Sequence, residues 1–313
     1  MEYLTLKDAL AKEDNTDVSG ITVILTEKKT LETAQGKSYL NLTVQDKSTG
    51  HSFKNFFRTD REYENQNLNL EEGKLYELFA KIGSYNGQKQ IQNARFRAVK
   101  EEDYGDLMSL VLPVYERKSV AVADFIELIG AHVTDERYLT FVSKAFGDFN
   151  LENKIWRDFL DAPAAKKHHG NKIHGLFFHT FKVVKNCIAI ANAYKDDSDL
   201  PYGFVDDDIN MSRLITAALL HDIMKIEEYS WETGIKMSGK YQLGHIERGI
   251  VYLNKINASL DNILEEEELD FLQYAILSHH GDFGPQKPKH IENWILHLSD
   301  MIDAKIVSEI ENK

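Results

Sequence analysis

The sequence predicts a two-domain protein in which a small all-β barrel is followed by an all-α helical bundle. A length of 313 residues suits about two domains. The hydrophobic period changes from that of strands to that of helices near residue 105. The charge changes at the same place: residues 1–100 hold 15 basic and 14 acidic residues, and the remainder holds 22 and 36. We therefore expect domains at residues 1–104 and 105–313.

Alternating β-branched and aromatic residues predict about five short strands in the first hundred residues. The alternating runs lie in residues 21–46, with a break at Gln35-Gly36, and in 51–57, 74–85 and 88–99. Asn86-Gly87 separates the last two runs, and Asn-Gly in this position is a strong signal for a hairpin. Five short strands in this length predict a small barrel that is closed or partly open.

From residue 105 onward, apolar residues recur at helical spacing. The predicted helices are separated by segments rich in Pro, Gly and Asp, such as 196–208 and 280–290. They cover residues 119–132, 136–146, 179–194, 211–226, 245–258, 267–280 and 291–310. We therefore expect the second domain to be all-α.

Composition favours a cytoplasmic protein without a membrane partner. No apolar run approaches the 18 or so residues of a membrane helix, and residues 1–15 lack the features of a secretory signal. The single cysteine, Cys187, excludes an internal disulfide and is read as a small buried thiol. No phosphate-binding loop, dinucleotide fingerprint or nucleophile elbow is present.

The helical half carries a series of histidines and aspartates that an ordinary core would not tolerate. His221 and Asp222 stand side by side in the apolar stretch LLHDIMK, residues 219–225. Imidazole and carboxylate groups on apolar helices are costly unless something pairs with them. Helical bundles build metal sites from such side chains on facing helices, so the series predicts a metal site. Its members are His168-His169, His174, His179, His221-Asp222, His245, His279-His280, His297 and Asp300.

The order of these residues resembles the HD-domain superfamily of metal-dependent phosphohydrolases over roughly residues 160–305. The resemblance implies that His179, His221, Asp222 and Asp300 hold one divalent metal ion. His245, His279 and His280 match the two-metal version, in which Asp222 would bridge the ions. Lys225 matches a lysine that some members carry three residues after the aspartate. Asp222 and Lys225 are thus the expected catalytic residues.

Several roles stay open at this stage. His279 and His280 can both reach a metal only if their helix ends there, which Gly281 and Pro285 indicate. Lys225 lies on the face of Asp222 and would meet a substrate phosphate or complement a helix C-terminus. Asp303 and His297 lie one turn from Asp300. The sequence does not decide whether they support a metal ligand or are solvated. Nitrogen and oxygen ligands suit one or two ions of Mn, Fe, Co or Zn.

A barrel followed by an HD domain resembles the YhaM-type 3′-to-5′ exoribonucleases, whose N-terminal domain is an OB fold. The matching stretches include YLNLTVQDKSTG, KIGSYNGQKQIQNARFRAV, HGLFFHT, ALLHDIMKI, LSHHG and LSDMIDAK. The resemblance implies hydrolysis of single-stranded RNA by metal-activated water, with single-stranded DNA as a second strand type. His168-His169 lies one residue further from Gly175-Leu176 than in that family.

OB folds bind single strands by aromatic stacking and a basic groove. The expected substrate contacts are His169, Lys225, Tyr85, Phe53, Lys89 and Arg95, within a wider set of Tyr39, Phe57, Phe96, Lys37, Lys54, Lys81 and Arg97. An alternative function is an HD-domain hydrolase of small nucleotides or cyclic dinucleotides with the barrel as a regulatory module. A third is a single-strand-binding protein that merely holds metal. A homo-oligomer is compatible with all three.

Overall fold

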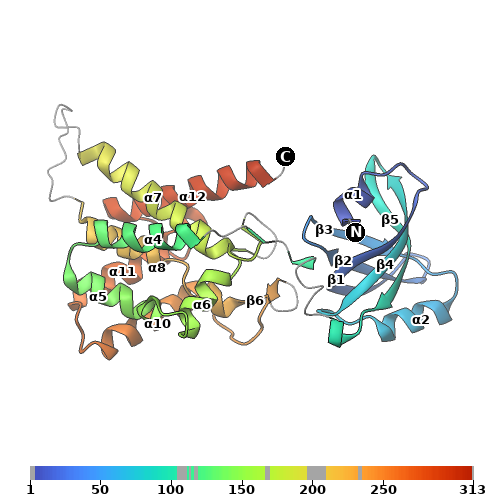
Figure 1. Cartoon of the computed structure of the whole chain (residues 1–313), viewed down its shortest axis with the longest axis horizontal. Coiled ribbons are helices and arrows are strands. Elements are labelled where there is room, and N and C mark those ends of the chain that lie inside the picture. The colour runs from blue at the N-terminus through green and yellow to red at the C-terminus, as the bar shows by residue number, and fades with distance from the viewer. Residues whose placement is uncertain are drawn as a thin grey trace. The chain divides into compact units, whose positions relative to one another are not determined.

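A computed structural model describes residues 4–103, 111–112, 114–115, 119–165, 170–195, 209–231 and 235–311 (Figure 1). The chain divides into two compact units. The first contains residues 1–114 with 230–236, and the second contains residues 115–229 with 237–313. The boundary predicted at residues 104/105 falls at the start of a stretch outside the described residues and stays a prediction.

The first unit is built on a five-stranded antiparallel sheet, which confirms the predicted all-β character. The strand order is β3-β2-β1-β4-β5. The strands are β1 (Asp17–Glu32), β2 (Ser38–Gln45), β3 (Gly50–Asn55), β4 (Leu75–Tyr85) and β5 (Gln88–Ala98). Two short helices that the sequence pattern did not predict are α1 (Leu6–Leu10) and α2 (Asp60–Asn69). Because β1 is 16 residues long, it pairs with β2 along one part and β4 along the other.

The predicted hairpin at Asn86-Gly87 is confirmed. Asn86 and Gly87 form a two-residue connection between β4 and β5, and Tyr85 pairs with Gln88 across it. Both turn residues have positive φ, 51° for Asn86 and 76° for Gly87. This is the conformation that a type I′ turn requires, and its twist matches the twist of the two strands.

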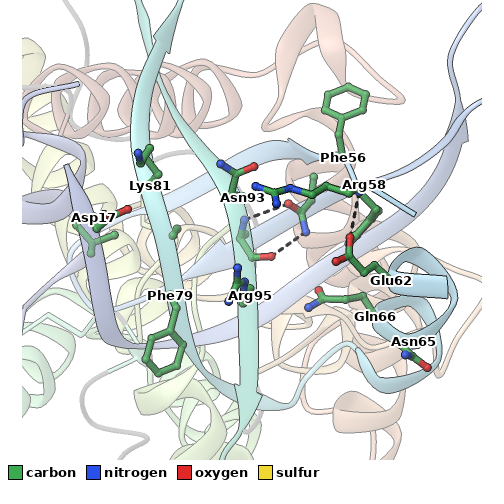
Figure 2. A pocket seen from close by; sticks show the side chains of 15 residues that line it. Asp17, Phe56, Arg58, Glu62, Asn65, Gln66, Phe79, Lys81, Asn93 and Arg95 are labelled. Atoms are coloured by element: carbon green, nitrogen blue, oxygen red, sulfur yellow. Dashed lines mark hydrogen bonds between the residues drawn. The ribbon is translucent and has the colours of Figure 1, made fainter. Parts of the chain in front are cut away.

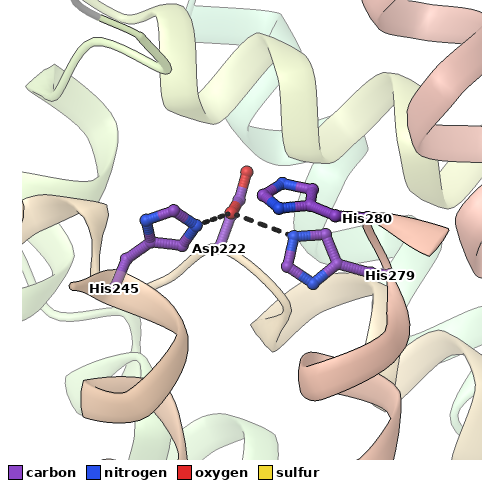
Figure 3. A group of neighbouring side chains, drawn as sticks. All are labelled: Asp222, His245, His279 and His280. Carbon is purple, nitrogen blue, oxygen red and sulfur yellow. Dashed lines mark ion pairs between the residues drawn. The ribbon is translucent and has the colours of Figure 1, made fainter. Parts of the chain in front are cut away.

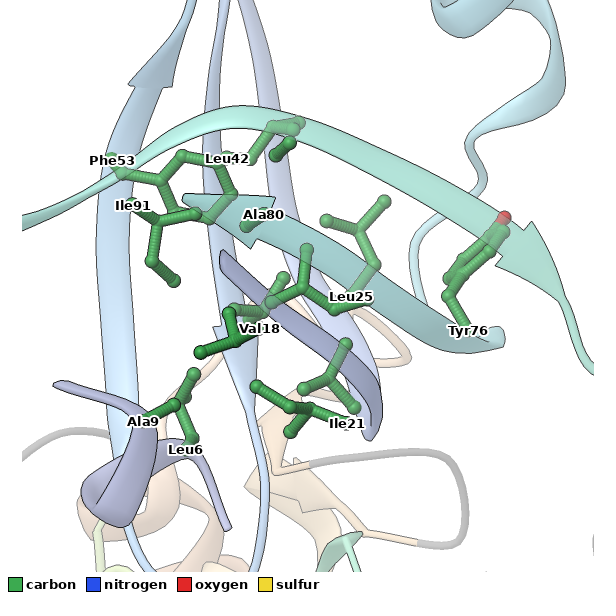
Figure 4. Packing of buried hydrophobic residues seen from close by; sticks show 14 of the residues in the cluster. Leu6, Ala9, Val18, Ile21, Leu25, Leu42, Phe53, Tyr76, Ala80 and Ile91 are labelled. Atoms are coloured by element: carbon green, nitrogen blue, oxygen red, sulfur yellow. The ribbon is translucent and has the colours of Figure 1, made fainter. Parts of the chain in front are cut away.

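Alternate residues of the strands form the core of the first unit. Leu40, Leu42 and Val44 of β2 are buried there. Phe53 is 2% exposed and packs in the same core, near Leu42 and Ile91 (Figure 4). The expected stacking role of Phe53 is therefore wrong, because its parity on β3 directs the ring inward. Phe57, from the wider set of stacking candidates, is also buried in this core.

The sheet does not close into a barrel, so of the two forms predicted from the sequence, closed or partly open, the partly open form applies. Among the described residues, no backbone ladder joins the edge strands β3 and β5. One buried side chain joins them instead: Asn55 Nδ2 donates to Ala94 O, and Ala94 N donates to Asn55 Oδ1, both at 3.1 Å. Asn55 therefore satisfies two edge backbone groups that a closed ladder would pair.

The second unit is helical, as the sequence predicts. Its helices are α4 (Ser119–His132), α5 (Glu136–Ala145), α6 (Lys154–Asp161), α7 (Gly175–Lys195), α8 (Met211–Leu220), α9 (Lys225–Glu228), α10 (His245–Ser259), α11 (Glu266–Ser278) and α12 (Ile291–Glu311). The pattern missed α6, whose Trp156 and Phe159 pack against Phe125 of α4. Within the described residues, no helix has the length and apolarity to cross a membrane.

Helix α8 lies at the centre of this unit. Its residues from Leu214 to Leu220 are all buried, and it contacts α4, α5, α7, α11 and α12 (Figure 1). A helix that is apolar on all sides is a core element rather than a surface element. Because His221 and Asp222 follow directly on α8, the fold carries them into the middle of the bundle.

Candidate metal centre

The end of α8 explains how His221 and Asp222 both face one site. The helix stops at Leu220, and residues 221–224 form turns before α9 begins at Lys225. His221 Nδ1 lies 2.8 Å from Ala218 O, to which it donates, and Nε2 faces the site, 3.3 Å from His179 Nε2. Both side chains are 1% exposed. A buried carboxylate and imidazole at the centre of the bundle need partners from the other helices.

The first cluster consists of His179, His221 and Asp222. One ligand atom from each lies within 4.8 Å of the others. His179 Nε2 is 3.4 Å from Asp222 Oδ2, and His221 Nε2 is 3.3 Å from the same oxygen. Asp300 of α12 joins this side, since its Oδ1 lies 3.2 Å from His179 Nε2. The structure thus brings together the four residues of the predicted one-metal motif.

The second cluster consists of Asp222, His245, His279 and His280 (Figure 3). His245 Nε2 lies 3.3 Å from Asp222 Oδ1, and His279 Nε2 lies 3.7 Å from it. Helix α11 ends at Ser278, so the condition under which His279 and His280 reach one site is met. The two oxygens of Asp222 therefore face different clusters, as a bridging carboxylate would.

The turn after α11 depends on a glycine. Gly281 has φ +57°, and a Cβ built there would lie 2.4 Å from His297 Cε1. His297 packs into this space and donates from Nδ1 to His279 O at 2.7 Å. His297, which the sequence left open, therefore supports the turn that presents His279 and His280.

Four of the histidines are oriented by an acceptor on Nδ1. His179 Nδ1 lies 2.8 Å from Asp303 Oδ2, and His245 Nδ1 lies 2.7 Å from Glu228 Oε2. His279 Nδ1 lies 2.6 Å from Ile276 O, and His221 is held by Ala218 as described above. In all four histidines, Nε2 is the ring nitrogen that lies near Asp222. This arrangement is typical of histidines that bind metal.

The donor set fits one or two divalent ions. Within the described part of the chain, Asp222 Oδ1, His245 Nε2 and His279 Nε2 are buried and have no hydrogen-bond partner. Such atoms are costly unless a cation or another partner satisfies them. The donors are nitrogen and oxygen only, which agrees with the ions expected from the sequence.

Burial and charge shift the pKa values of these groups in different directions. For His179, burial would lower the pKa, but the hydrogen bonds with Asp222, Asp300 and Asp303 outweigh burial and raise it well above the ordinary value, so a bound cation would displace a proton there. Burial lowers the pKa of His279 well below its ordinary value, and the nearby His280 lowers it further. Burial also lowers the pKa of His280. For Asp222, burial alone would raise the pKa, but the charges of Lys225 and His221 outweigh burial and hold it well below the ordinary value. Neutral imidazole and ionised carboxylate are the ligand forms.

Lys225 contacts the shared carboxylate. Its Nζ lies 2.6 Å from Asp222 Oδ2, and its side chain is 12% exposed. Burial would lower the pKa of Lys225, but the attraction of Asp222 outweighs burial and raises it. A permanent cation therefore lies beside the first cluster, where a phosphate oxygen would also be attracted.

Two orienting carboxylates belong to the site beyond the predicted ligands. The role of Asp303 was left open by the sequence, and it is a buried partner of His179. Glu228 was missed, because no spacing rule connects α9 with His245, which lies 17 residues later. Burial would raise the pKa of Glu228, but the hydrogen bond from His245 outweighs it and lowers that pKa.

The expected substrate contacts have different surroundings. His169, together with His168, lies outside the described residues. Tyr85 is 70% exposed near the β4–β5 turn. Lys89 Nζ is engaged by Lys12 O and Asp14 Oδ1, both at 2.8 Å. Arg95 lines a pocket of the first unit (Figure 2). Of Tyr85, Lys89 and Arg95, only Arg95 belongs to the lining of this pocket.

Comparison with protein families agrees with this geometry. Residues 176–305 match the family model described as HD domain. The match contains both clusters and Asp300, so the helical region carries an HD domain. An HD domain indicates a metal-dependent hydrolase, and the clusters are the residues that could hold its divalent metal.

Among solved structures, the chain is similar to one described as RecG bound to a three-way DNA junction. The identity is 16%, over 63% of this chain and 26% of that chain, with a TM-score of 0.26. This chain therefore spans about a quarter of the length of that protein. A likeness at this TM-score carries no argument about fold or function.

The orienting carboxylates lead to a paired prediction. Asp303→Asn should weaken binding to the first cluster, and Glu228→Gln should weaken binding to the second. Each should cost about 10–100-fold in metal affinity, as is usual for partners of metal-bound histidines. Mn²⁺ titration against a competing chelator would measure both sites.

Glu227→Gln is the matched control, because Glu227 pairs with Arg248 rather than with a histidine. Its metal affinities should stay at the wild-type values. If Asp303→Asn and Glu228→Gln bind both ions as tightly as the wild type does, the two carboxylates do not position metal ligands.

Proposed function

We propose that this chain, with its HD domain, is a metal-dependent 3′-to-5′ exonuclease acting on single-stranded RNA, with single-stranded DNA as a second substrate. The observation that carries the hydrolytic part is the sharing of Asp222 between two clusters whose histidine Nε2 atoms lie near its two oxygens. This is the donor arrangement of a two-ion phosphohydrolase site.

The strand specificity is supported by the architecture of the first unit. We infer an OB fold from the meander β1-β2-β3, helix α2 between β3 and β4, and the pairing of β1 with β4. The link between Asn55 and Ala94 brings β3 next to β5, where an OB barrel would close. OB folds bind single strands on the face of their second and third strands and on the loops between strands 1 and 2 and between strands 4 and 5.

The chain's own residues have separable roles in this proposal. His179, His221, Asp222 and Asp300 would hold one ion, and Asp222, His245, His279 and His280 the other. When bound, the ions supply Lewis-acid activation of water and neutralisation of phosphate charge. Asp303 and Glu228 orient two of the histidines, and Lys225 provides a fixed positive charge beside Asp222.

The test is the product pattern from an end-labelled oligoribonucleotide. With Mn²⁺ and a 5′-labelled twenty-mer, we expect a ladder that shortens from the 3′ end, because an exonuclease releases one nucleotide at a time. Chelation of the metal should stop it. Cleavage of small nucleotides or cyclic dinucleotides without a ladder would favour the regulatory-module alternative, and binding without turnover would contradict hydrolysis.

A further inference from the structure

The first unit contains a pocket at the open seam between strands β3 and β5, which we call the seam pocket (Figure 2). Its volume is about 570 Å³, the size of a small-molecule site. It is lined by the start of β1, the segment 55–58 at and after the end of β3, helix α2, and residues of β4 and β5. Neither the HD domain nor its metal clusters contribute to this pocket.

The floor of the pocket is built by the same contacts that join β3 to β5. Between Phe79 and Lys81, β4 has one residue, while the facing part of β5 has Asn93 and Ala94. Asn93 has φ 52°, so it forms a β-bulge. The buried Asn55 holds the backbone of Ala94 in this bulge from the other side. Bulges of this kind redirect side chains, and here Asn93 and Arg95 line the pocket.

Three cationic side chains line the pocket without a carboxylate partner among the described residues: Arg58, Lys81 and Arg95. In contrast, Arg97, two residues beyond Arg95 on the same face of β5, pairs with Glu77. The lining also contains Asp17 and Glu62, and the Glu62 carboxylate accepts a hydrogen bond from Arg58 N at 3.0 Å. The excess of positive charge favours an anionic ligand.

The pocket also offers flat and hydrogen-bonding surfaces. Phe56 is 51% exposed and stacks on Tyr39, with ring centroids 4.9 Å apart, so Tyr39 supports the ring while much of its surface stays accessible. Phe79 lines another part, and Figure 2 shows Arg95 between the two phenylalanines. Gln66 Oε1 is buried and has no hydrogen-bond partner among the described residues. An unpaired buried acceptor is costly, and an N–H donor of a ligand that reached it would satisfy it.

We propose that the seam pocket binds one nucleotide of single-stranded RNA. A phosphate meets Arg58, Lys81 and Arg95, the base stacks on Phe56, and Gln66 accepts a hydrogen bond from the base. This inference rests on the proposed function, and it names the place where the first unit holds the strand. The pocket would recognise a phosphate and a base, and both a nucleotide within a strand and a free mononucleotide carry these groups.

The experiment compares full-length variants in binding and hydrolysis. Binding of a fluorescent twenty-mer RNA is measured in EDTA, so that cleavage does not interfere. Arg95→Ala and Phe56→Ala should each weaken binding about tenfold, since a phosphate contact or a stacked base is lost. For Arg95→Ala, the slope of log affinity against log salt should fall by about one. Hydrolysis of an activated small phosphodiester should equal that of the wild type.

Lys29→Ala and Leu68→Ala are the matched controls, because Lys29 is paired with Glu27, Leu68 is an exposed residue of α2, and neither lines the pocket. Both should bind RNA as the wild type does.

Equal affinity of the pocket variants and the controls would overturn the inference while leaving the exonuclease proposal intact. Direct binding of UMP or AMP by the wild type, lost in Arg95→Ala and Phe56→Ala, together with no binding of the twenty-mer, would overturn the strand assignment. A wild type that binds RNA but forms no ladder would contradict the proposed function alone.

Discussion

Asp222→Ala is expected to remove bound metal and hydrolytic activity together. Asp222 belongs to both clusters: its Oδ2 faces His179 and His221, and its Oδ1 faces His245 and His279. Loss of a partner that only orients a metal ligand costs about 10–100-fold in affinity or activity, and loss of a shared ligand should cost more. Elemental analysis and the rate of phosphodiester hydrolysis, measured on the same sample, check both parts.

The controls separate ligand loss from damage to the fold. Asp222→Asn keeps the size of the side chain and removes its charge, so it should lose metal as well. Asp270→Asn removes the charge of an exposed aspartate on α11 and should change neither quantity. Circular dichroism of each variant monitors helix content. Full metal content with normal turnover in Asp222→Ala would refute the assignment of both clusters.

Most strands and helices follow from periodicity because most of these elements bury one face. In β2, the inward residues Leu40, Leu42 and Val44 alternate with the less buried Asn41 and Thr43, so the pattern can be read directly. Helix α8 was equally clear because its apolar residues continue without interruption. Helix α2 was missed because it has no buried residue and therefore no apolar stripe.

The error at Phe53 shows that the position of a residue along the strand, rather than its type, decides whether its side chain faces the core. Along the end of β3 and the residue after it, Phe53 and Asn55 are buried, whereas Lys54 and Phe56 are exposed. Aromatic residues suit both a barrel core and a stacking surface, so residue type alone could not separate Phe53 from Phe56. The buried Asn55 gave no usable signal either, because its partner Ala94 is 39 residues away.

The metal clusters were accessible from sequence because their residues occur in an ordered series on separate helices. The groups that orient the histidines of these clusters could not be predicted from sequence. Whether His179 is oriented by Asp303 depends on the packing of α7 against α12, which no local spacing reports. The sharing of Asp222 between clusters likewise depends on where α8 and α11 end. The residue types were thus predictable, and the second partners of the imidazoles required the tertiary structure.

Lys225→Ala is expected to slow hydrolysis about 10²–10³-fold, the range for loss of a group that stabilises transition-state charge. It should not weaken metal binding. Lys225 Nζ lies 2.6 Å from Asp222 Oδ2, so removing this ammonium leaves more negative charge for a metal ion. Metal affinity should therefore stay equal or rise while activity falls. Metal titration, together with kcat and KM for an oligoribonucleotide, checks that metal affinity and activity change in these different directions.

The division between kcat and KM carries the mechanistic information. If Lys225 meets charge that develops during cleavage, kcat falls and KM changes little, whereas a uniform phosphate contact mainly raises KM. Lys225→Arg should recover part of the rate, because it restores a cation, and Lys185→Ala on the exposed side of α7 should behave as the wild type. Loss of metal in Lys225→Ala would make the lysine a structural partner of Asp222. Unchanged kcat and KM would leave it the role of complementing a helix terminus, because a cation that contributes to neither substrate binding nor the transition state has no part in the reaction.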